Sequence, residues 1–439
     1  MGMLRVAIMC HFSNRDVREK LPLSKLVFQN RIRCALGKQP MPVGYNDYAP
    51  WVTGLIKEYE KFQDLEVHVI APHSGMTRFT HEFSNNGVYY HFFNPNIPNI
   101  QGIIPKQLIL RDNHNFVRNR FFVKRFVKRI SPDIVDLIGT ENPYYSITAL
   151  DIEDVPIYVT VQTVYTNPDR LKLSGECDRS RWDTELKIHR KTNYYGSNSR
   201  MHRDLIINNN PDALIMKHKF CKQMPKCVCD GAKSYDFVLF AANVIVGKGI
   251  EDAILALAKV KKVKQNVRLN VVGRCEAQYK AVLASMIEAL DLKSNVEFMD
   301  YFCLHSDMFR YVQKASFAVL PNKLDDISSA VIEAMSLYIP LVTYKTSGTP
   351  YLNKDAECVL LADIGDIDTL AAQMIRLLET PSLAATLARN AKAFVMKEYD
   401  STACAKQTVQ NYKAVVDHYV RNTPIPDELL FDINEHPIY

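Results

Sequence analysis

The feature that most constrains this chain is a regular alternation, in its second half, of short apolar runs with segments of helical periodicity. In one such segment the apolar residues recur at positions i, i+3, i+4, i+7 and i+8 from Ile250, so a helix there has one face suited to cover a sheet. The expected strands are 236–241, 267–272, 296–299 and 317–320, and the expected helices are 250–263, 277–290 and 306–314. Strands that alternate with helices form parallel sheets, because each helix carries the chain back to the edge where it started. The sequence therefore predicts an α/β fold.

The first half shows the same alternation less regularly. Its expected strands are 4–10, 66–71, 88–93, 134–138 and 157–161, and a helix is expected over 51–62. An insertion at 12–49, rich in Asn, Pro and basic residues, separates the first strand from that helix. A loop of such length is usually functional or disordered, and we assign it no role.

The length of the chain, 439 residues, exceeds one ordinary hydrophobic core, so two domains of roughly 200 residues each are expected. A polar, Lys-rich stretch without clear periodicity separates the two halves. We place the first domain at 1–216, an interdomain linker at 217–235, the second domain at 236–400, and a final helix with a tail at 401–439.

Composition excludes several classes of protein. Hydrophobic residues make up 47% and charged residues 23% of the chain, which is typical of a soluble globular protein. The net charge of +6 is too small to indicate nucleic acid by itself. No apolar run reaches the roughly 18 residues of a membrane-spanning helix, and the N-terminus lacks a signal-peptide pattern. The ten cysteines include no CxxC pair, so we expect no metal site. Because the sequence shows no export signal, we expect a cytoplasmic protein.

The most informative stretch follows the expected strand 317–320 and opens a helix. Ser328 or Ser329 can cap that helix, whose N-terminus offers N–H groups and a positive dipole end to an anion such as phosphate. Asp325 precedes the helix and Glu333 lies in its first turns, eight positions later. Carboxylates accept hydrogen bonds from the vicinal hydroxyls of a sugar or a ribose. In the alternative interpretation, Glu333 only favours the helix dipole and Asp325 is a solvated loop residue.

A second motif, Lys248-Gly249, stands at the start of the helix that follows strand 236–241. A lysine there can neutralise a diphosphate as the bond from the diphosphate to carbon breaks. The alternative is a solvated lysine beside a turn glycine, because Lys-Gly pairs are common. The motif gains weight from its place upstream of the anion-binding helix.

Together these residues, in this order, resemble glycosyltransferase family 4, the retaining nucleotide-sugar enzymes of the GT-B fold. The resemblance is strong over about 236–412 and includes Lys248-Gly249, Val271-Val-Gly273, the acid-x7-acid spacing and Gly348-Thr-Pro. It implies two Rossmann-like domains with parallel sheets facing a cleft, and a final helix that crosses back to the first domain. The N-terminal domain is then expected to hold the acceptor and the C-terminal domain the nucleotide sugar.

The resemblance assigns roles to donor-side residues. It implies that Glu333 contacts the nucleotide ribose, Asp325 the donor sugar and Lys248 the diphosphate, and these three are the expected catalytic residues. The further residues expected to bind the donor are Asn243, Gly273, Arg274, Tyr301, Ser328 and Ser329. Asn243 stands where the family often has an arginine, which leaves one fixed cation instead of two.

Two residues of the N-terminal half are expected on the acceptor side. Glu141 follows a segment that looks like the family's fourth strand and is a candidate for acceptor binding or for a base. The alternative for Glu141 is a loop carboxylate paired with a nearby cation. Gln162 stands where many members carry a histidine, and its amide can form hydrogen bonds but cannot act as an acid or base.

A basic helix is predicted over 116–130, with apolar residues on one half of its projection. The residues expected to contact an anionic membrane surface are Arg118, Arg120, Phe121, Lys124, Arg125 and Lys128. The alternative is a sheet-covering helix with a solvated basic face. No nucleic-acid module accompanies this helix, so we expect no nucleic-acid partner.

The sequence thus predicts a hexosyltransferase that moves a sugar from a UDP- or GDP-linked donor to a saccharide or lipid-linked saccharide acceptor, with retention of configuration and without a metal or other cofactor. Its expected role is glycan or polysaccharide synthesis in the cytoplasm, at the inner face of the cell membrane. The alternatives are a GT-B sugar-nucleotide 2-epimerase and a catalytically silent subunit that docks on membrane. An NAD enzyme is disfavoured because no strand leads into GxGxxG.

Overall fold

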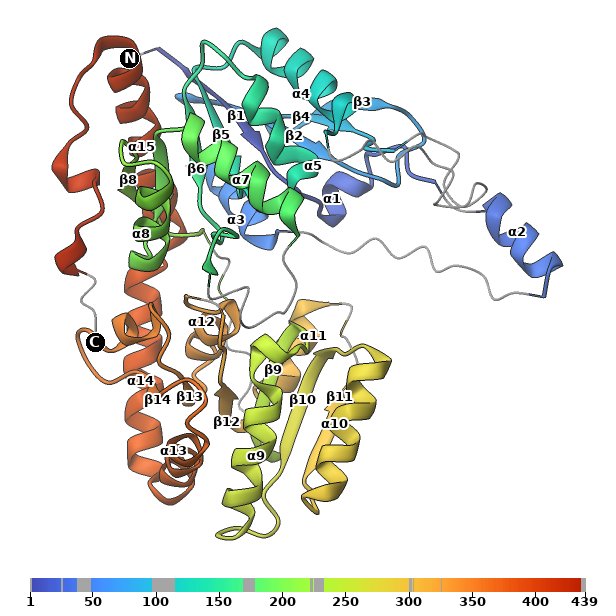
Figure 1. Cartoon of the computed structure of the whole chain (residues 1–439), viewed down its shortest axis with the longest axis vertical. Coiled ribbons are helices and arrows are strands. Elements are labelled where there is room, and N and C mark those ends of the chain that lie inside the picture. The colour runs from blue at the N-terminus through green and yellow to red at the C-terminus, as the bar shows by residue number, and fades with distance from the viewer. Residues whose placement is uncertain are drawn as a thin grey trace.

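The computed structural model describes residues 2–24, 27–37, 49–96, 115–168, 178–221, 224, 233–299, 302, 304–324 and 326–435. Two α/β domains follow one another along the long axis of the molecule (Figure 1). The N-terminal domain is built on an eight-stranded sheet and the C-terminal domain on a six-stranded sheet. The expected α/β class with two largely parallel sheets is therefore confirmed.

The N-terminal sheet has the strand order β3-β4-β2-β1-β5-β6-β7-β8. Its strands are β1 (Leu4–Met9), β2 (Leu65–Pro72), β3 (Thr80–Asn85), β4 (Val88–Phe93), β5 (Ile134–Ile138), β6 (Ile157–Thr160), β7 (Tyr194–Ser197) and β8 (Leu214–Lys217). The pairing of β3 with β4 is antiparallel, whereas β1, β2, β4, β5, β6, β7 and β8 pair in parallel. Every residue of β5 is buried, because helices cover both faces of the sheet.

Two layers of helices cover this sheet. One face is covered by α1 (Arg15–Arg18), α3 (Pro50–Tyr59) and the C-terminal helix α15 (Ser401–Arg421). The other face is covered by α4 (Val117–Ile130), α5 (Pro143–Ser146), η1 (Ile147–Asp151), α7 (Arg179–Lys191) and α8 (Arg200–Asn209). Helix α2 (Val27–Ala35) projects away from the sheet in Figure 1.

The C-terminal sheet is parallel and has the strand order β11-β10-β9-β12-β13-β14. Its strands are β9 (Tyr235–Asn243), β10 (Leu269–Arg274), β11 (Val296–Met299), β12 (Ala315–Leu320), β13 (Leu341–Tyr344) and β14 (Leu360–Ala362). Its helices are η2 (Val246–Lys248), α9 (Ile250–Lys261), α10 (Ala277–Ala289), α11 (His305–Val312), α12 (Ser329–Ser336), η3 (Thr349–Asn353), α13 (Ile367–Glu379) and α14 (Pro381–Glu398). The chain winds outward from β9 to β11 and then returns to β12 on the other side of β9, so the strand order reverses between β9 and β12.

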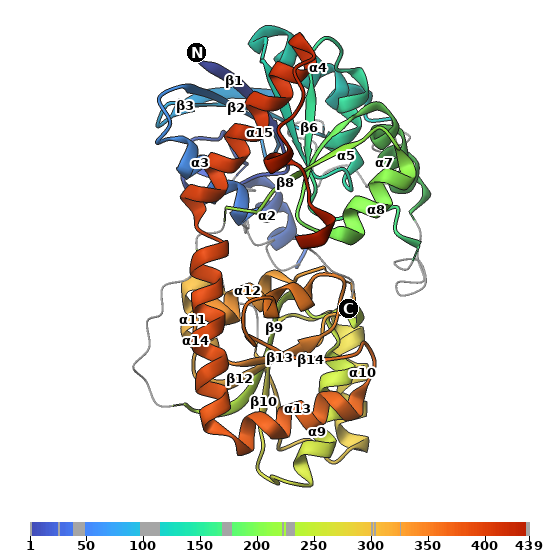
Figure 2. The same cartoon turned by 90° about the vertical axis from the view of Figure 1, so that its left-hand side faces the viewer.

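Helix α15 returns the chain to the N-terminal domain, where it packs beside α3 (Figure 2). Its buried side chains Cys404, Ala405, Val409, Tyr412 and Val415 join the apolar cluster beneath β1 and β2. The chain then ends in two short turns, η4 (Asp427–Leu429) and η5 (Ile433–Glu435). In the described part of the chain, no helix is both long and apolar enough to cross a membrane.

Candidate functional site

The reversal of strand order between β9 and β12 marks the candidate donor site. In open parallel sheets, ligands bind beyond the carboxyl ends of the strands at such a point, because the two following loops diverge and leave room between them. The loop after β9 carries Lys248, and the loop after β12 leads into α12, which carries Glu333. The two segments that were identified separately in the sequence therefore follow neighbouring strands of the sheet.

A close backbone contact joins these two loops. Gly249 has a φ of +70°, and a Cβ at this position would overlap the carbonyl oxygen of Pro321, the residue directly after β12. The backbone N–H of Lys323 also donates to the carbonyl of Gly247 at 3.0 Å. Since only glycine combines this φ with this contact, Gly249 holds the half-buried Lys248 against the loop before α12.

Helix α12 begins at Ser329, and its N-cap residue is Ser328. The Ser328 side chain is buried and makes no side-chain capping hydrogen bond within the described chain, whereas Ser329 is exposed. The first N–H groups of any α-helix have no partner within the helix, so this end can bind an anion. Glu333 lies one turn into the helix and is half-buried.

The end of β10 completes the donor-side edge. Gly273 has a φ of +142°, and a Cβ on it would overlap the carbonyl oxygen of Ala241 in β9. One residue further along, Arg274 of β10 lies opposite Asn243 of β9 in the register of the sheet, and both side chains are exposed. The structure thus brings Asn243, Lys248, Gly273, Arg274, Ser328, Ser329 and Glu333 to one edge of the sheet. Asp325 and Tyr301 lie outside the described residues.

The two acceptor-side candidates converge over Gly139, which follows β5. Gly139 has a φ of +80°, and a Cβ on it would overlap the carboxylate of Glu141 and lie 2.9 Å from Nε2 of Gln162. The Gln162 amide donates to the carbonyl of Ile138 at 3.1 Å, and the Glu141 side chain is buried. The loops after β5 and β6 therefore place a carboxylate and an amide side by side.

Two histidines at the same edge were missed in the sequence. His11 follows β1, and its ring meets that of Tyr144 edge-on at 5.4 Å. His73 follows β2, and burial lowers its pKa to about 4, with smaller effects from Arg18 and His11. Burial also lowers the pKa of His11, so both rings are neutral hydrogen-bonding groups at pH 7. In the sequence, the signal that could have identified both residues was a histidine at the end of an expected parallel strand.

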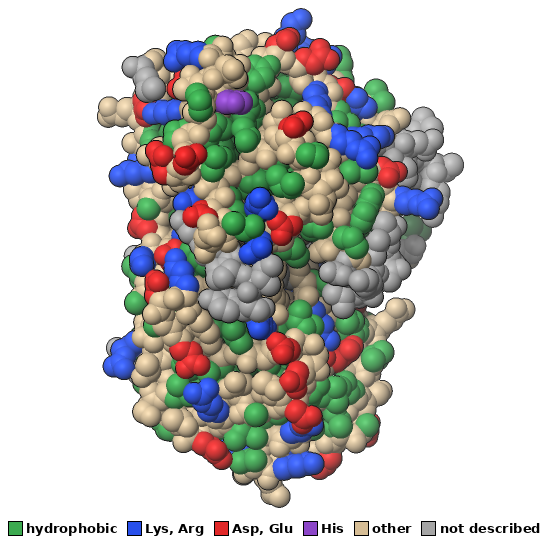
Figure 3. Space-filling model, turned by 60° about the vertical axis from the view of Figure 1, so that its left-hand side comes forward, with side chains coloured by type: hydrophobic (Ala, Val, Ile, Leu, Met, Phe, Trp, Pro, Cys, Tyr) green, Lys and Arg blue, Asp and Glu red, His purple; other side chains and the backbone are tan. Residues whose placement is uncertain are grey.

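Helix α4 exposes part of its predicted basic face. Phe121, Lys124, Arg125 and Lys128 are exposed, and 59% of Phe121 is accessible. Arg120 instead pairs with Asp151 of η1 at 2.5 Å, and Arg118 donates to the carbonyl of Pro95 at 2.8 Å. The outward face of α4 is thus narrower than the helical projection indicates. On the face drawn in Figure 3, basic and acidic side chains are intermixed.

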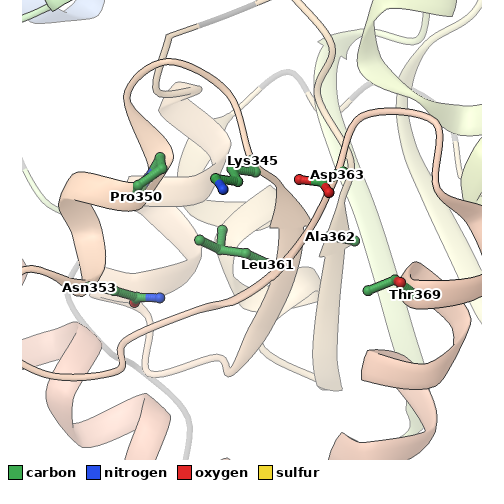
Figure 4. Close-up of a pocket in the computed structure, with 7 residues that line it drawn as sticks. All are labelled: Lys345, Pro350, Asn353, Leu361, Ala362, Asp363 and Thr369. Carbon is green, nitrogen blue, oxygen red and sulfur yellow. The ribbon is translucent and has the colours of Figure 1, made fainter. Parts of the chain in front are cut away.

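A pocket of about 430 Å³ lies at the carboxyl ends of β13 and β14 (Figure 4). It is lined by Lys345, Pro350, Asn353, Leu361, Ala362, Asp363 and Thr369. None of the candidate site residues lines it. The Asn353 side-chain amide donates a hydrogen bond of 2.9 Å to the carbonyl of Val359.

Comparison with known proteins finds a family model that matches part of the C-terminal half of the chain. Residues 231–394 match the family model described as glycosyl transferases group 1. The chain is 22% identical over 185 residues to the alpha-D-kanosaminyltransferase of Streptomyces kanamyceticus, covering 42% of this chain and 47% of the relative. It is 23% identical over 167 residues to the capsular polysaccharide biosynthesis glycosyltransferase CapM of Staphylococcus aureus, covering 38% of this chain and 43% of the relative. The chain thus matches less than half the length of these two relatives.

Solved structures match over nearly the whole chain. The sucrose-phosphate synthase of Thermosynechococcus elongatus superposes with a TM-score of 0.69 at 15% identity, covering 93% of this chain and 98% of that one. Anabaena HepE in complex with UDP and glucose superposes with a TM-score of 0.63 at 14% identity, covering 94% of this chain and 100% of that one. The chain therefore has the two-domain GT-B fold, and its C-terminal domain carries the sequence pattern of the group 1 glycosyl transferases.

Proposed function

We propose that this protein is a glycosyltransferase that moves a hexosyl group from a UDP- or GDP-linked sugar to a saccharide or lipid-linked saccharide. The contact of Gly249 with Pro321 is the observation that carries the proposal, because it holds a lysine and a helix N-terminus together at the carboxyl edge of a parallel sheet. The match to group 1 glycosyl transferases and the UDP complexes of the HepE structures support a nucleotide sugar as the donor.

In this proposal the diphosphate binds between Lys248 and the N-terminus of α12. The ammonium group and the helix dipole stabilise the charge that develops as the sugar–phosphate bond breaks, so no divalent metal is required. Glu333 accepts hydrogen bonds from the ribose hydroxyls. Glu141 and Gln162 face the acceptor, and only Glu141 can take up a proton. Retention of configuration follows from the resemblance to family 4.

We also propose that the protein works in the cytoplasm at the surface of an anionic membrane. The exposed face of α4 combines Phe121 with Lys124, Arg125 and Lys128, which suits insertion of one aromatic ring among anionic headgroups. A lipid-linked acceptor would then lie within reach of the N-terminal domain.

The experiment is an incubation of the protein with UDP- and GDP-sugars, with candidate saccharide acceptors, in the presence and absence of EDTA. The proposal predicts a glycoside with the anomeric configuration of the donor, formed equally well in EDTA. A new nucleotide sugar without a glycoside would instead indicate a 2-epimerase. No turnover of any donor would indicate a silent binding subunit.

A further inference from the structure

A buried aspartate, Asp252, lies in the first turn of α9, which begins directly after the turn that carries Lys248. An aspartate is seldom buried without a partner, and this one has two. Its Oδ1 accepts a hydrogen bond from the Lys323 ammonium group at 2.8 Å, and its Oδ2 accepts one from the Tyr344 hydroxyl at 2.6 Å. Both carboxylate oxygens of Asp252 are therefore bound to other segments of the C-terminal domain.

The two partners of Asp252 follow neighbouring strands of the sheet. Lys323 belongs to the loop between β12 and α12, and Tyr344 is the last residue of β13. Tyr344 is completely buried, and burial together with the Asp252 carboxylate raises the pKa of its hydroxyl, which therefore stays protonated and donates. The Lys323 side chain is 16% exposed, so water screens its ion pair with Asp252 only weakly. Because β12 lies between β9 and β13, Asp252 connects the segments at the carboxyl ends of three adjacent strands.

Lys323 contacts the chain on both sides of Lys248. Its backbone N–H donates to the carbonyl of Gly247 at 3.0 Å, just before Lys248, and its ammonium group reaches Asp252, just after Lys248. A Cβ on Gly247 would lie 2.5 Å from the Leu324 side chain, so the next residue of the same loop also packs on this turn. The loop before α12 therefore fixes the position from which the Lys248 side chain starts.

The turn at 246–249 carries the charge that the proposed reaction uses. A lysine ammonium group stands on a flexible four-carbon stem, so its position depends on how firmly the backbone beneath it is held. A charge that is already in place stabilises a leaving group more than one that must first be ordered, because no reorganisation is needed during the reaction. Contacts that fix this turn should therefore strengthen the binding of a diphosphate.

We propose that Asp252 is a positioning residue that, through Lys323, holds the turn of Lys248 in place against the N-terminus of α12. The proposal rests on the proposed transferase function, since that function puts the donor diphosphate between Lys248 and α12. Lys323 acts here through its carboxylate partner and is not itself a ligand of the diphosphate. A nucleoside diphosphate should depend on this arrangement more than a nucleoside monophosphate does, because it presents the larger charge to the turn.

The test compares Asp252→Asn with a matched control, Asp236→Asn. Asp236 lies near the amino end of β9, and its carboxylate likewise accepts a lysine, Lys264, at 2.7 Å and a second donor, the backbone N–H of Arg268, at 2.9 Å. Both variants therefore remove one negative charge and one lysine partner from the same domain. They differ in the end of the sheet at which the change is made.

Isothermal titration measures the Kd of each protein for UDP and UMP, or for GDP and GMP if the wild type binds guanine nucleotides. For Asp252→Asn we expect the Kd of the diphosphate to rise about tenfold and that of the monophosphate to rise less than about threefold. Asp236→Asn should leave both values within about twofold of the wild type. A role confined to the stability of the fold would not produce this difference between the two nucleotides.

Three results of this titration would overturn the proposal. Equal losses of diphosphate and monophosphate binding in Asp252→Asn would mean that the aspartate only supports the fold. Unchanged binding of both nucleotides would mean that the turn of Lys248 does not depend on it. Tighter binding of the diphosphate would mean that Lys323, once released from Asp252, binds the diphosphate itself.

Amide hydrogen exchange tests the same role without a ligand. Exchange over 246–249 and 321–324 should rise in Asp252→Asn and not in Asp236→Asn, because the hydrogen bond from Lys323 to Gly247 joins these two segments. If the wild type binds no nucleotide and exchange still rises, the nucleotide site fails and the positioning of the turn stands. If exchange does not rise, the positioning fails whatever the nucleotide affinity.

Should Asp252→Asn not fold, Lys323→Met removes the same ion pair from its less buried side and keeps the length of the side chain. Lys323→Met should weaken diphosphate binding about tenfold and raise exchange over 246–249, and Lys323→Arg, which can still pair with Asp252, should recover most of both. Diphosphate binding or exchange in Lys323→Met equal to that of the wild type would contradict the proposal.

Discussion

The hydroxyl of Tyr412 in α15 donates a hydrogen bond of 2.5 Å to the carboxylate of Asp136 in β5. Tyr59 of α3 donates in turn to the Tyr412 hydroxyl at 3.2 Å, and Thr160 of β6 donates to Asp136 at 2.8 Å. Asp136 is completely buried. These hydrogen bonds attach α15 to the centre of the N-terminal sheet. The helix that follows the C-terminal domain is therefore bound to the N-terminal domain through Asp136, a titratable group.

Asp136→Asn should change how stability depends on pH. Burial raises the pKa of Asp136 from 3.8 to about 6, against the hydrogen bonds from Tyr412 and Thr160. The folded state therefore binds this proton more tightly than the unfolded state does. The stability that the proton contributes is fully present below pH 3.8 and is lost as the pH rises through about 6. Between pH 5 and pH 8 the wild type should therefore lose about 1 kcal/mol of unfolding free energy relative to Asp136→Asn. Urea titrations of both proteins at the two pH values measure this loss. A difference that does not vary with pH would contradict a raised pKa.

Gly249→Ala should destabilise the protein and weaken nucleotide binding, because the added Cβ meets Pro321. Gly365→Ala is the matched control, since Gly365 has a similar φ of +84° with no atom within 4 Å of an added Cβ. Both variants carry the cost of the left-handed conformation, about 1 kcal/mol, and only Gly249→Ala carries the overlap as well. Thermal unfolding should rank Gly249→Ala clearly below Gly365→Ala. Equal losses would mean that the contact with Pro321 does not constrain the Lys248 turn.

Glu398→Gln should loosen the segment where α14 passes into α15. Burial opposes ionisation of Glu398, but hydrogen bonds from Lys219 and Lys354 outweigh it and hold the pKa at about 2. The ionised form contributes stability above pH 4.5, and that contribution is lost as the pH falls through about 2. At pH 7 the variant should lose about 2 kcal/mol of unfolding free energy, because two lysines lose their carboxylate partner.

Glu357→Gln is the control for this change, since Glu357 is about half exposed and lies 3.9 Å from Arg376. Exposed pairs contribute little, so its loss should stay below about 0.5 kcal/mol. Equal losses in the two variants would rule out a special role for Glu398.

Binding to anionic vesicles tests the exposed face of α4. Lys124→Glu/Lys128→Glu should reduce co-sedimentation with phosphatidylglycerol vesicles at least tenfold, and neither protein should bind neutral phosphatidylcholine vesicles. Lys262→Glu/Lys293→Glu makes the same charge change at exposed positions of the C-terminal domain and should bind like the wild type. Equal losses in the two double variants would mean that net charge, and not α4, determines binding.

The sequence predicted best the elements whose apolar residues form a continuous run or recur with a regular period. The apolar face of the helix that begins at Ile250 and the largely apolar runs at Val88–Phe93, Ile134–Ile138 and Val296–Met299 all predicted elements that the structure contains. Strand β3 was missed because it is polar and lies at the edge of the sheet. Strand β7 was missed because it has only four residues and contains Gly196, where the phenol of Tyr158 occupies the space of a Cβ.

The sequence predicted the loops of the candidate site but not the contacts between them. The position of Lys248 after one strand and of Glu333 after another followed from local pattern. The contact of Gly249 with Pro321 is a tertiary backbone contact, and no local pattern encodes it. Likewise, a helical projection shows which residues share a face of α4, but only the fold shows that Asp151 holds Arg120.

The central claim is a nucleotide-sugar site at the carboxyl edge of the C-terminal sheet, and isothermal titration with UDP and GDP tests it most directly. The wild type should bind one of the two nucleotides equally well with and without EDTA. Lys248→Ala and Glu333→Ala should each weaken that binding at least tenfold while the melting temperature without ligand stays within a few degrees, because both side chains are only half-buried. Wild-type binding that both variants retain, or no binding of either nucleotide, would contradict the site.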